Sequence, residues 1–510
     1  NSEMVSALVV SNRATLELLG DVTLAVEDEV IVGPQGTLLC RVTNNSAMVN
    51  DLWAGVGPTI TSAVFRVEAE GLVTASGQGY TGTTTAGNGP GGGTGTRNDT
   101  GGGGGGGGHG GRGGNPQSPY AGGDAYDSVT QPLTPGSAGG AGYASVGGAG
   151  GGAVKIVATR LELEGAITAD GLSGAAHTYG ASGGGAGGSL WLQVGAFSGA
   201  GFLSANGGNS FVVNEEDGGG GAGGRIAIYY TANSFSGEIQ ACGGLSGSGV
   251  GQGQGGGAGT IYIQSSAQTL GDLIIDNRDA LGALTPWPAN VTLDQVTVGR
   301  GGNLEIRGET NWTGAGLYIA DGGAFHLSDA ATLHLSALTL ASNATVYCHG
   351  QNRSGQIDEA WAGRGVTIEV QTAAIGAGAI VTAIQMVSFV VILIILLVVA
   401  NTMAMTTRER IGDYAIMKTL GFGGGSIAGM IFGEALVISL TGCLAGMALT
   451  FPAAKAFGHT LSAYFPIFLV SDETLWFDLL FAFLIAFFAA IIPARHAIRV
   501  GIADGLRRIG

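Results

Sequence analysis

A cluster of charged residues stands directly behind a long apolar run near the C-terminal end of the chain. The set comprises Arg408, Glu409, Arg410, Asp413 and Lys418. The segment predicts a short amphipathic helix at a membrane surface, with Gly421 as its C-cap. Such a helix binds either a groove in a protein partner or lipid headgroups.

Residue types that support catalysis are present without the spacing that catalysis needs. The sequence contains no GxxxxGK[ST] loop, no HExxH motif, no GxSxG elbow and no CxxC pair. The acidic residues 215–217 offer oxygen ligands for calcium, but a solvated loop is the favoured interpretation. His326 and His334 are expected on the outward faces of strands. We therefore expect no enzyme activity, metal or cofactor on this chain, and any ATPase would be a separate subunit.

Three apolar segments must position the charged cluster, at about 386–405, 427–451 and 475–494. Each is long enough to cross about 30 Å of hydrocarbon as a helix. The first connection and the segment after the third span hold seven basic residues, whereas the second connection holds only Lys455. Basic residues favour the cytoplasmic side, which predicts a multi-pass cell-membrane protein with its C-terminus in the cytoplasm and its N-terminal part outside.

The segment "NTMAMTTRERIGDYAIMKTLGF" (401–422) and the end "PARHAIRVGIADGLRRIG" (493–510) resemble FtsX-like ABC permeases, the class of macrolide exporters and lipoprotein-release permeases. The resemblance covers about 384–510. It implies a permease subunit that works with a cytoplasmic ATP-binding subunit, as a homodimer or a permease pair. The charged cluster and Gly421 would then couple the chain to that ATPase. A helix that only anchors the chain at the bilayer surface is the alternative.

The second apolar segment carries two further features. Glu434 is its only carboxylate, and such residues are functional or paired inside membranes; pairing with a nearby Lys or Arg is the favoured interpretation. The GxxxG pairs Gly429/Gly433 and Gly442/Gly446 predict close helix packing, with ordinary membrane-helix glycine content as the alternative.

The chain before this region has a different chemistry. It holds 85 of the 98 glycines and nearly all of the net charge of −16, which argues against nucleic acid as a partner. Apolar residues recur there at two periods. The columns with a period of 36 include Ile156, Leu192, Ile228 and Ile167, Leu203, Ile239, and those with a period of 21 include Leu304, Phe325, Val346 and Val296, Leu317, Leu338. Repeats of this kind predict stacked coils that share one apolar core.

We accordingly predict a short β-rich start at 1–60, a glycine-rich parallel β-solenoid at 61–285 and a parallel β-helix with 21-residue coils at 286–383. An all-α membrane domain with three transmembrane helices follows at 384–510. Residues from about 60 to 383 resemble large glycine-rich surface proteins with a β-solenoid. The polyglycine segment within 80–145 is compatible with flexible linker or with packed extended chain.

The family pattern is incomplete in this chain. FtsX-like permeases have four membrane helices and a mixed α/β outer domain, whereas no sufficiently long apolar run precedes 386. Segment 365–383 reads as the start of another coil, and the membrane helix is expected from Ile384. Two alternatives to a permease subunit follow: a structural or adhesive surface protein with a membrane anchor, and a non-functional fusion of two unrelated genes.

Overall fold

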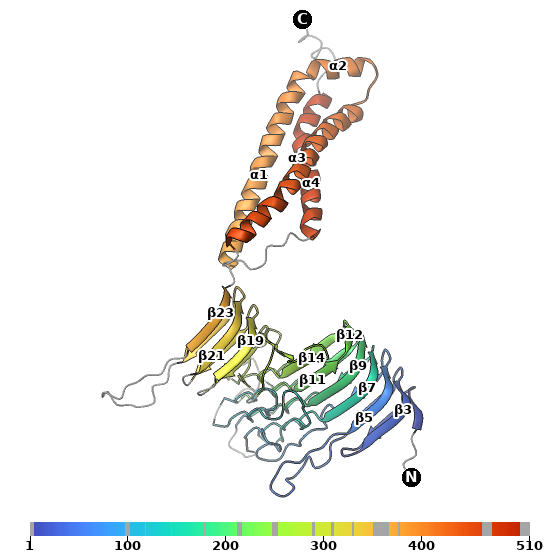
Figure 1. Cartoon of the computed structure of the whole chain (residues 1–510), viewed down its shortest axis with the longest axis vertical. Coiled ribbons are helices and arrows are strands. Elements are labelled where there is room, and N and C mark those ends of the chain that lie inside the picture. The colour runs from blue at the N-terminus through green and yellow to red at the C-terminus, as the bar shows by residue number, and fades with distance from the viewer. Residues whose placement is uncertain are drawn as a thin grey trace, which may run out of the picture. The chain divides into compact units, whose positions relative to one another are not determined.

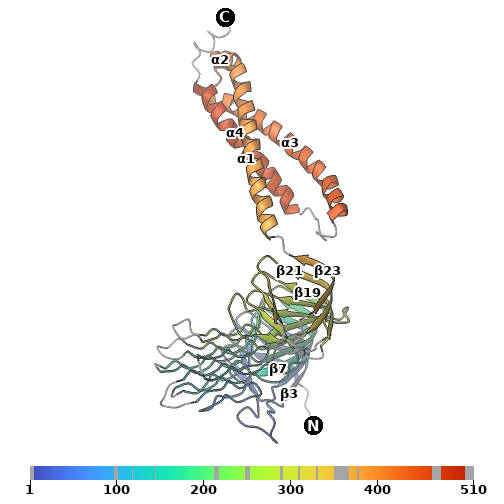
Figure 2. The same cartoon turned by 90° about the vertical axis from the view of Figure 1, so that its left-hand side faces the viewer.

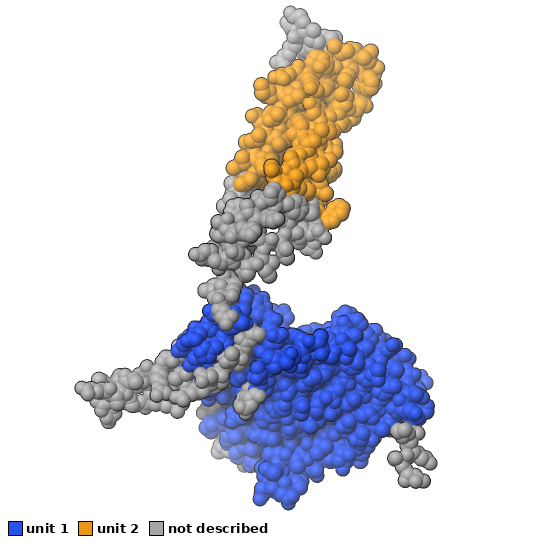
Figure 3. All heavy atoms as spheres, in the orientation of Figure 1, with its two compact units in different colours: residues 1–376 blue, residues 377–510 orange. Residues whose placement is uncertain are grey.

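The computed structural model divides the chain into two compact units, Asn1–Gly376 and Ala377–Gly510 (Figure 3). The first consists mostly of β-sheet and the second of helices. The structure describes residues 5–96, 102–117, 119–143, 145–177, 179–211, 217–246, 253–287, 291–307, 311–328, 331–349, 367–375, 378–461 and 472–499.

The largest sheet of the first unit has 13 strands within the described residues and includes strands from both ends of the unit (Figure 1). Its strands are β1 (Val5–Val10), β3 (Thr23–Val32), β5 (Thr59–Val67), β7 (Ala153–Leu163), β9 (Ser189–Gly199), β11 (Arg225–Tyr230), β12 (Ala232–Phe235), β14 (Thr260–Ser265), β15 (Asp272–Ile275), β17 (Gln295–Val298), β19 (Asn311–Ile319), β21 (Thr332–Leu340) and β23 (Thr367–Ile375). They follow one another in chain order, except that β12 pairs with β9 alongside β11.

Two smaller sheets complete the unit. The six-stranded sheet comprises β2 (Thr15–Leu18), β4 (Thr37–Cys40), β6 (Leu72–Thr74), β8 (Ala166–Thr168), β10 (Phe202–Ser204) and β13 (Glu238–Gln240). The four-stranded sheet comprises β16 (Thr285–Pro286), β18 (Asn303–Ile306), β20 (Ala324–Ser328) and β22 (Thr345–His349). Strands β1 to β5 join the same sheets as their successors, so the described residues 5–60 form no separate layer.

The pairing register follows the two sequence periods. Ile156 pairs with Leu192 and Leu192 with Ile228, and Ile167 pairs with Leu203. In the second half, Leu304 lies opposite Phe325. These side chains are buried because alternate residues of each strand point to the same face, and the sheets enclose them.

One pair departs from the expected parallel arrangement. Strand β15 runs antiparallel to β14, with Ile261 opposite Ile274. The reversal follows a turn after Ser265, whose amide donates to the Gln268 side chain at 2.9 Å. Strand β17 is parallel to β15, with Leu273 opposite Val296, so it also runs antiparallel to β14. The spacing of 21 residues is present from the next pair, in which Val296 lies opposite Leu317.

The glycine-rich segments form extended chains without helix or strand assignment, seen beside the strands in Figures 1 and 2. Their backbones are hydrogen-bonded to one another: Gly104 N donates to Ala181 O at 2.9 Å, Gly107 N to Gly184 O at 2.9 Å, and Gly184 N to Gly219 O at 3.0 Å. The chains lie too close for a larger side chain, since a Cβ at Gly185 would stand 2.1 Å from Ala149 O. The described glycines of 102–114 are buried, so this polyglycine run is packed chain.

The β unit has two apolar clusters. One contains Ile60, Phe65, Ile156 and Leu192, and the other contains residues of the second half such as Phe325. The cysteines of the described part, Cys40, Cys242, Cys348 and Cys443, are free thiols.

The helical unit comprises α1 (Gly378–Glu409), α2 (Ile411–Thr419), α3 (Gly424–Leu461) and α4 (Asp472–Arg499) (Figure 1). Within the described residues, α1, α3 and α4 are long and apolar enough to cross a membrane, over 391–409, 424–449 and 478–499. Helix α1 begins at Gly378, six residues before the predicted start at Ile384. Segment 378–383 is therefore helical rather than part of a coil, because its Ala, Ile and Val residues continue the apolar helix once β23 has ended.

Candidate functional site

The short helix α2 lies against the long helices of its own unit. Ile411, Tyr414 and Ala415 are buried there, as the amphipathic pattern requires. Tyr414 packs in one cluster with residues of α1, α3 and α4, among them Met403, Ile431 and Ala497. Burial raises the pKa of the Tyr414 phenol. Helix α2 is therefore packed against α1, α3 and α4 through its buried face.

Two charged side chains attach α2 to its neighbours. At its start, Arg410 Nη1 lies 3.6 Å from Glu434 Oε1 on α3. The sequence predicted that Glu434 pairs with a nearby Lys or Arg, and in the structure its partner is Arg410. It ties the beginning of α2 to α3.

Lys418 attaches the other end of α2 to α4. Its Nζ donates to Ile498 O at 2.7 Å and to Ala497 O at 3.3 Å. The last carbonyls of a helix have no partner within that helix, and a cation there is stabilising. Helix α3 comes close at the same point, because a Cβ at Gly424 would lie 3.0 Å from Ile498 Cγ2. The predicted coupling residue Lys418 therefore braces α2 within the chain.

The opposite side of α2 and the residues around it are exposed. The exposed set, called the elbow surface below, comprises Arg408, Glu409, Asp413, Ile416, Leu420 and Phe422. Leu420 is 72% exposed and Phe422 54%. Gly421 has φ +91°, a left-handed conformation that ends a helix and favours glycine. Apolar side chains flanked by charges make this surface suited to a groove in another protein.

The four glycines of the predicted packing motifs leave open space beside α3 in the described part of the chain. There, a Cβ built at Gly429, Gly433, Gly442 or Gly446 would meet nothing within 4 Å beyond its own helix backbone. Gly433 and Gly442 are nine residues apart, which places them on opposite sides of α3. Close helix packing at these glycines stays a prediction.

The contacts of α2 with α3 and α4 could not be predicted from the sequence. Arg410 and Glu434 are 24 residues apart, and Lys418 and Ile498 are 80 apart. Neither spacing is a helical neighbour relation, so no periodicity signals them. The partners meet because α3 and α4 fold back beside α2.

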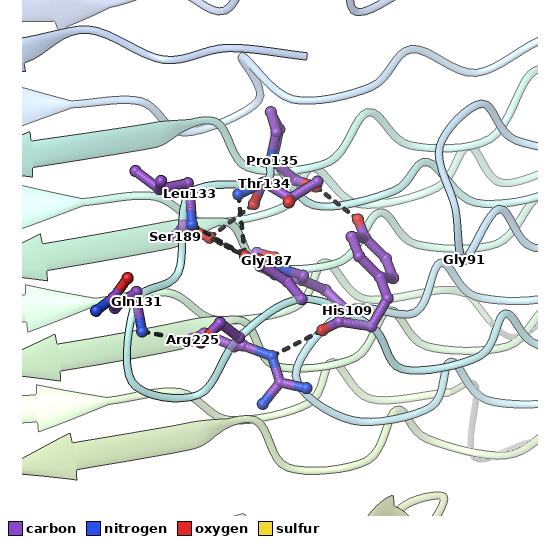
Figure 4. A network of polar contacts seen from close by, with 12 residues as sticks. Gly91, His109, Gln131, Leu133, Thr134, Pro135, Gly187, Ser189 and Arg225 are labelled. Atoms are coloured by element: carbon purple, nitrogen blue, oxygen red, sulfur yellow. Dashed lines mark hydrogen bonds and ion pairs between the residues drawn. The ribbon is translucent and has the colours of Figure 1, made fainter. Parts of the chain in front are cut away.

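The β unit contains a buried polar network that sequence reasoning also missed (Figure 4). The fully buried His109 donates from Nδ1 to Gly187 O at 2.7 Å, and its Nε2 lies 3.5 Å from Asp127 Oδ2. Ser189 Oγ donates to Thr134 O at 2.6 Å. The buried Arg225 donates from Nε to Tyr126 O at 2.8 Å. The network fastens the glycine-rich segments to β9 and β11.

The pKa values of the buried network are shifted by burial and by hydrogen bonds within the network. Burial pushes the pKa of Asp127 upward, but its hydrogen bond to His109, the charge of His109 and the amides of Ser128 and Thr134 outweigh it, and the pKa lies below its ordinary value. Burial lowers the pKa of Arg225 to about 10. Although Ser, His and Asp meet here, Ser189 and Asp127 share the same ring nitrogen and His109 is closed to solvent. Nucleophilic catalysis needs the base between them.

The other sequence candidates are placed as follows. His326 is partly buried and stacks on Tyr347, with ring centroids 4.5 Å apart, and His334 Nδ1 lies 2.9 Å from Glu369 Oε2. Asp217 is fully buried rather than solvated, while 215 and 216 lie outside the described residues. Among the described residues, no group of three or more His, Cys, Asp or Glu could hold a metal ion.

Comparison with known proteins adds one finding. Residues 385–502 match the family model described as FtsX-like permease C-terminal. No curated protein and no solved structure matches the chain. The matched stretch is about a quarter of the chain and contains α2, α3, α4 and nearly all of the apolar part of α1. Together with three helices apolar enough to span a membrane, it supports an FtsX-like permease and a membrane location. The likeness of 60–383 to glycine-rich surface proteins stays a prediction.

Proposed function

We propose that the chain is a membrane permease subunit of an ABC-type exporter that works with a separate cytoplasmic ATPase and carries an extracytoplasmic β-solenoid. The observation that carries the proposal is the elbow surface on α2, within the stretch that matches the permease family. The elbow surface is the docking site for the ATP-binding subunit. The permease works as a dimer, and the first connection and the C-terminus face the cytoplasm.

The contacts of α2 support a coupling role. A partner that pushes on the elbow surface would act on a helix tied to α3 through Glu434 and to α4 through Ala497 and Ile498. Motion of α2 would then reach both helices. A membrane-surface anchor would not need these ties, since its charged side chains would face lipid headgroups.

The experiment places a glutamate at three exposed positions at the same end of the helical unit. Tagged full-length chain is purified from membranes, and ATP hydrolysis that co-purifies with it is measured. Arg408→Glu and Leu420→Glu are expected to lower this hydrolysis at least about tenfold, because each places a charge in the interface. The matched control is Arg495→Glu, an exposed arginine on α4. Equal recovery from all variants would refute the coupling role.

The second candidate is a structural or adhesive surface protein whose three helices only anchor it. The observation that favours it is the size of the β unit, Asn1–Gly376, against a helical unit with three apolar helices in its described part. A fusion of two unrelated genes would give the same arrangement without a function. Stable membrane insertion with no co-purifying ATP hydrolysis in the unaltered chain would favour these alternatives.

A further inference from the structure

The outer face of the 13-stranded sheet carries a groove that none of the functions above uses. It crosses β9, β11 and β14 and has a volume of about 470 Å³. Its lining contains amides, hydroxyls and tyrosines, and no charged side chain. Such a volume lies within the range of small-molecule sites. The question is which ligand suits a lining of this composition.

The groove is organised by the strand register. Gln193 on β9, Tyr229 on β11 and Gln264 on β14 lie directly opposite one another in one row. Adjacent strands are about 4.8 Å apart, so the two amides stand roughly 10 Å apart with the tyrosine between them. In the next row Thr231 N donates to Gly195 O at 2.8 Å, and Gly195 has no side chain to fill the space beside Thr231.

One wall of the groove is rigid before any ligand arrives. Tyr262 donates from its hydroxyl to Gln264 Oε1 at 2.8 Å, and Gln264 Nε2 donates to Thr269 O at 3.2 Å. Tyr229 donates from its hydroxyl to Thr130 O at 2.8 Å, which fixes its ring. Side chains held in this way lose little conformational freedom when a ligand binds.

The other wall offers unused hydrogen-bonding groups. Across the described part of the chain, the side chains of Gln193, Thr231 and Ser266 have no hydrogen-bond partner. An amide supplies donors and an acceptor together, and a hydroxyl supplies both. A ligand with several adjacent hydroxyl groups presents the matching pattern, because each of its hydroxyls also donates and accepts.

A second groove crosses β17, β19 and β21, measures about 270 Å³, and includes Gln295, Gly316, Tyr318 and Thr339, with Asp294 at its edge. The register places it on the opposite face of the sheet. Tyr229 shares a face with Val296 and Leu317, whereas Gln295 and Tyr318 alternate with those two residues. The second groove therefore does not extend the first.

We propose that the groove across β9, β11 and β14 binds a neutral carbohydrate, with Gln193 and Thr231 as hydrogen-bonding residues and Tyr229 as the ring on which a sugar packs. The lining explains the choice. Nucleic acid would be repelled by the net charge of −16, and an apolar ligand would leave the amides unpaired. An extended peptide adds to a sheet edge, whereas this groove lies on a sheet face.

The test uses full-length chain in lipid nanodiscs and a panel of hexasaccharides of glucose, mannose, xylose and N-acetylglucosamine, with hexagalacturonate as the anionic comparison. Isothermal titration calorimetry is expected to detect at least one neutral member with a dissociation constant of about 1 mM or lower. Gln193→Ala and the near-isosteric Thr231→Val should each weaken it about three- to tenfold, the effect of losing one or two hydrogen bonds.

Gln117→Ala is the matched control, since Gln117 is exposed and lines neither groove. It should leave the affinity unchanged, and thermal unfolding should show that all variants are folded. Absence of binding to every neutral member, tighter binding of hexagalacturonate, or unaltered affinity in both groove variants would overturn the proposal. None of these outcomes depends on an ATPase partner, so the proposed membrane function stands or falls separately.

Discussion

Replacing Gly185 with alanine tests whether the glycine-rich segments are tightly packed chain. A Cβ at this position would lie 2.1 Å from Ala149 O and 2.4 Å from Ala149 C. Both atoms belong to backbone, so no side-chain rotation can relieve the contact. Real Cβ atoms essentially never come nearer than 3.0 Å, and one of the two chains must move by nearly 1 Å.

The displacement has a calculable cost. Gly185 N donates to Leu172 O at 2.9 Å, and Gly208 N donates to Gly185 O at 2.8 Å. A shift of this size strains or breaks both hydrogen bonds in a buried place. Each buried group left unpaired costs about 1–3 kcal/mol, and overpacking itself costs a similar amount. We expect Gly185→Ala to lower the free energy of unfolding of the β unit by about 3 kcal/mol.

The assay compares two variants with the same chemical change. Gly316→Ala is the control, because its Cβ would meet only Gln295 Cγ, at 3.9 Å. Thermal unfolding followed by tryptophan fluorescence should show a lower midpoint for Gly185→Ala, by roughly 5 °C, and little change for Gly316→Ala. Hydrogen exchange of peptides covering 183–188 should rise only in the first variant.

Equal midpoints for the two variants would refute the reasoning. In that case the segments around Gly185 would have room for a side chain, and they would behave as flexible linker. If hydrogen exchange at 183–188 in the unaltered protein were as fast as in an unstructured peptide, the same conclusion would follow.

Three further predictions concern charged and thiol groups. The folded-state pKa of Asp127 lies below its ordinary value, so the ionised carboxylate stabilises the fold above the unfolded-state pKa. This stabilisation is lost as the pH falls through the folded-state pKa. Asp127→Asn should therefore flatten the acid limb of a curve of stability against pH. Lys418→Met should lower the stability of the helical unit by about 1–2 kcal/mol and speed exchange at the end of α4, whereas the exposed control Arg408→Met should do neither. Burial raises the pKa of Cys40 to about 12, so iodoacetamide at pH 8 should alkylate the exposed Cys348 first and Cys40 only after unfolding, as mass spectrometry of peptides can show.

The pairing of the strands with a period of 36 could be predicted from the sequence because apolar residues recur at that spacing. Ile156, Leu192 and Ile228 are alternating apolar residues at a constant spacing, and stacked parallel strands place equal positions side by side. The antiparallel pair of β14 and β15 was not accessible, since a short turn with Gln268 breaks the period only once.

The glycine-rich segments and the buried network were harder to read, for a physical reason. Glycine has no side chain whose pattern could indicate a packing partner. A glycine run is therefore equally compatible with packed chain and with flexible linker. His109, Asp127 and Arg225 stand in or beside such segments, where polar residues normally indicate solvent. Their burial depends on neighbours far away in the chain, and the same is true of the contacts of Arg410 and Lys418 in the candidate site.

The constant register of β7, β9 and β11 has an evolutionary consequence. Since Ile156 faces Leu192 and Leu192 faces Ile228, excision of residues 189–224 would bring Ile228 opposite Ile156 without disturbing any apolar column. Duplication of the same stretch would likewise lengthen the sheet by one unit. Recombination between equivalent positions of neighbouring units can therefore add or remove one whole unit, because the new neighbours already match in register.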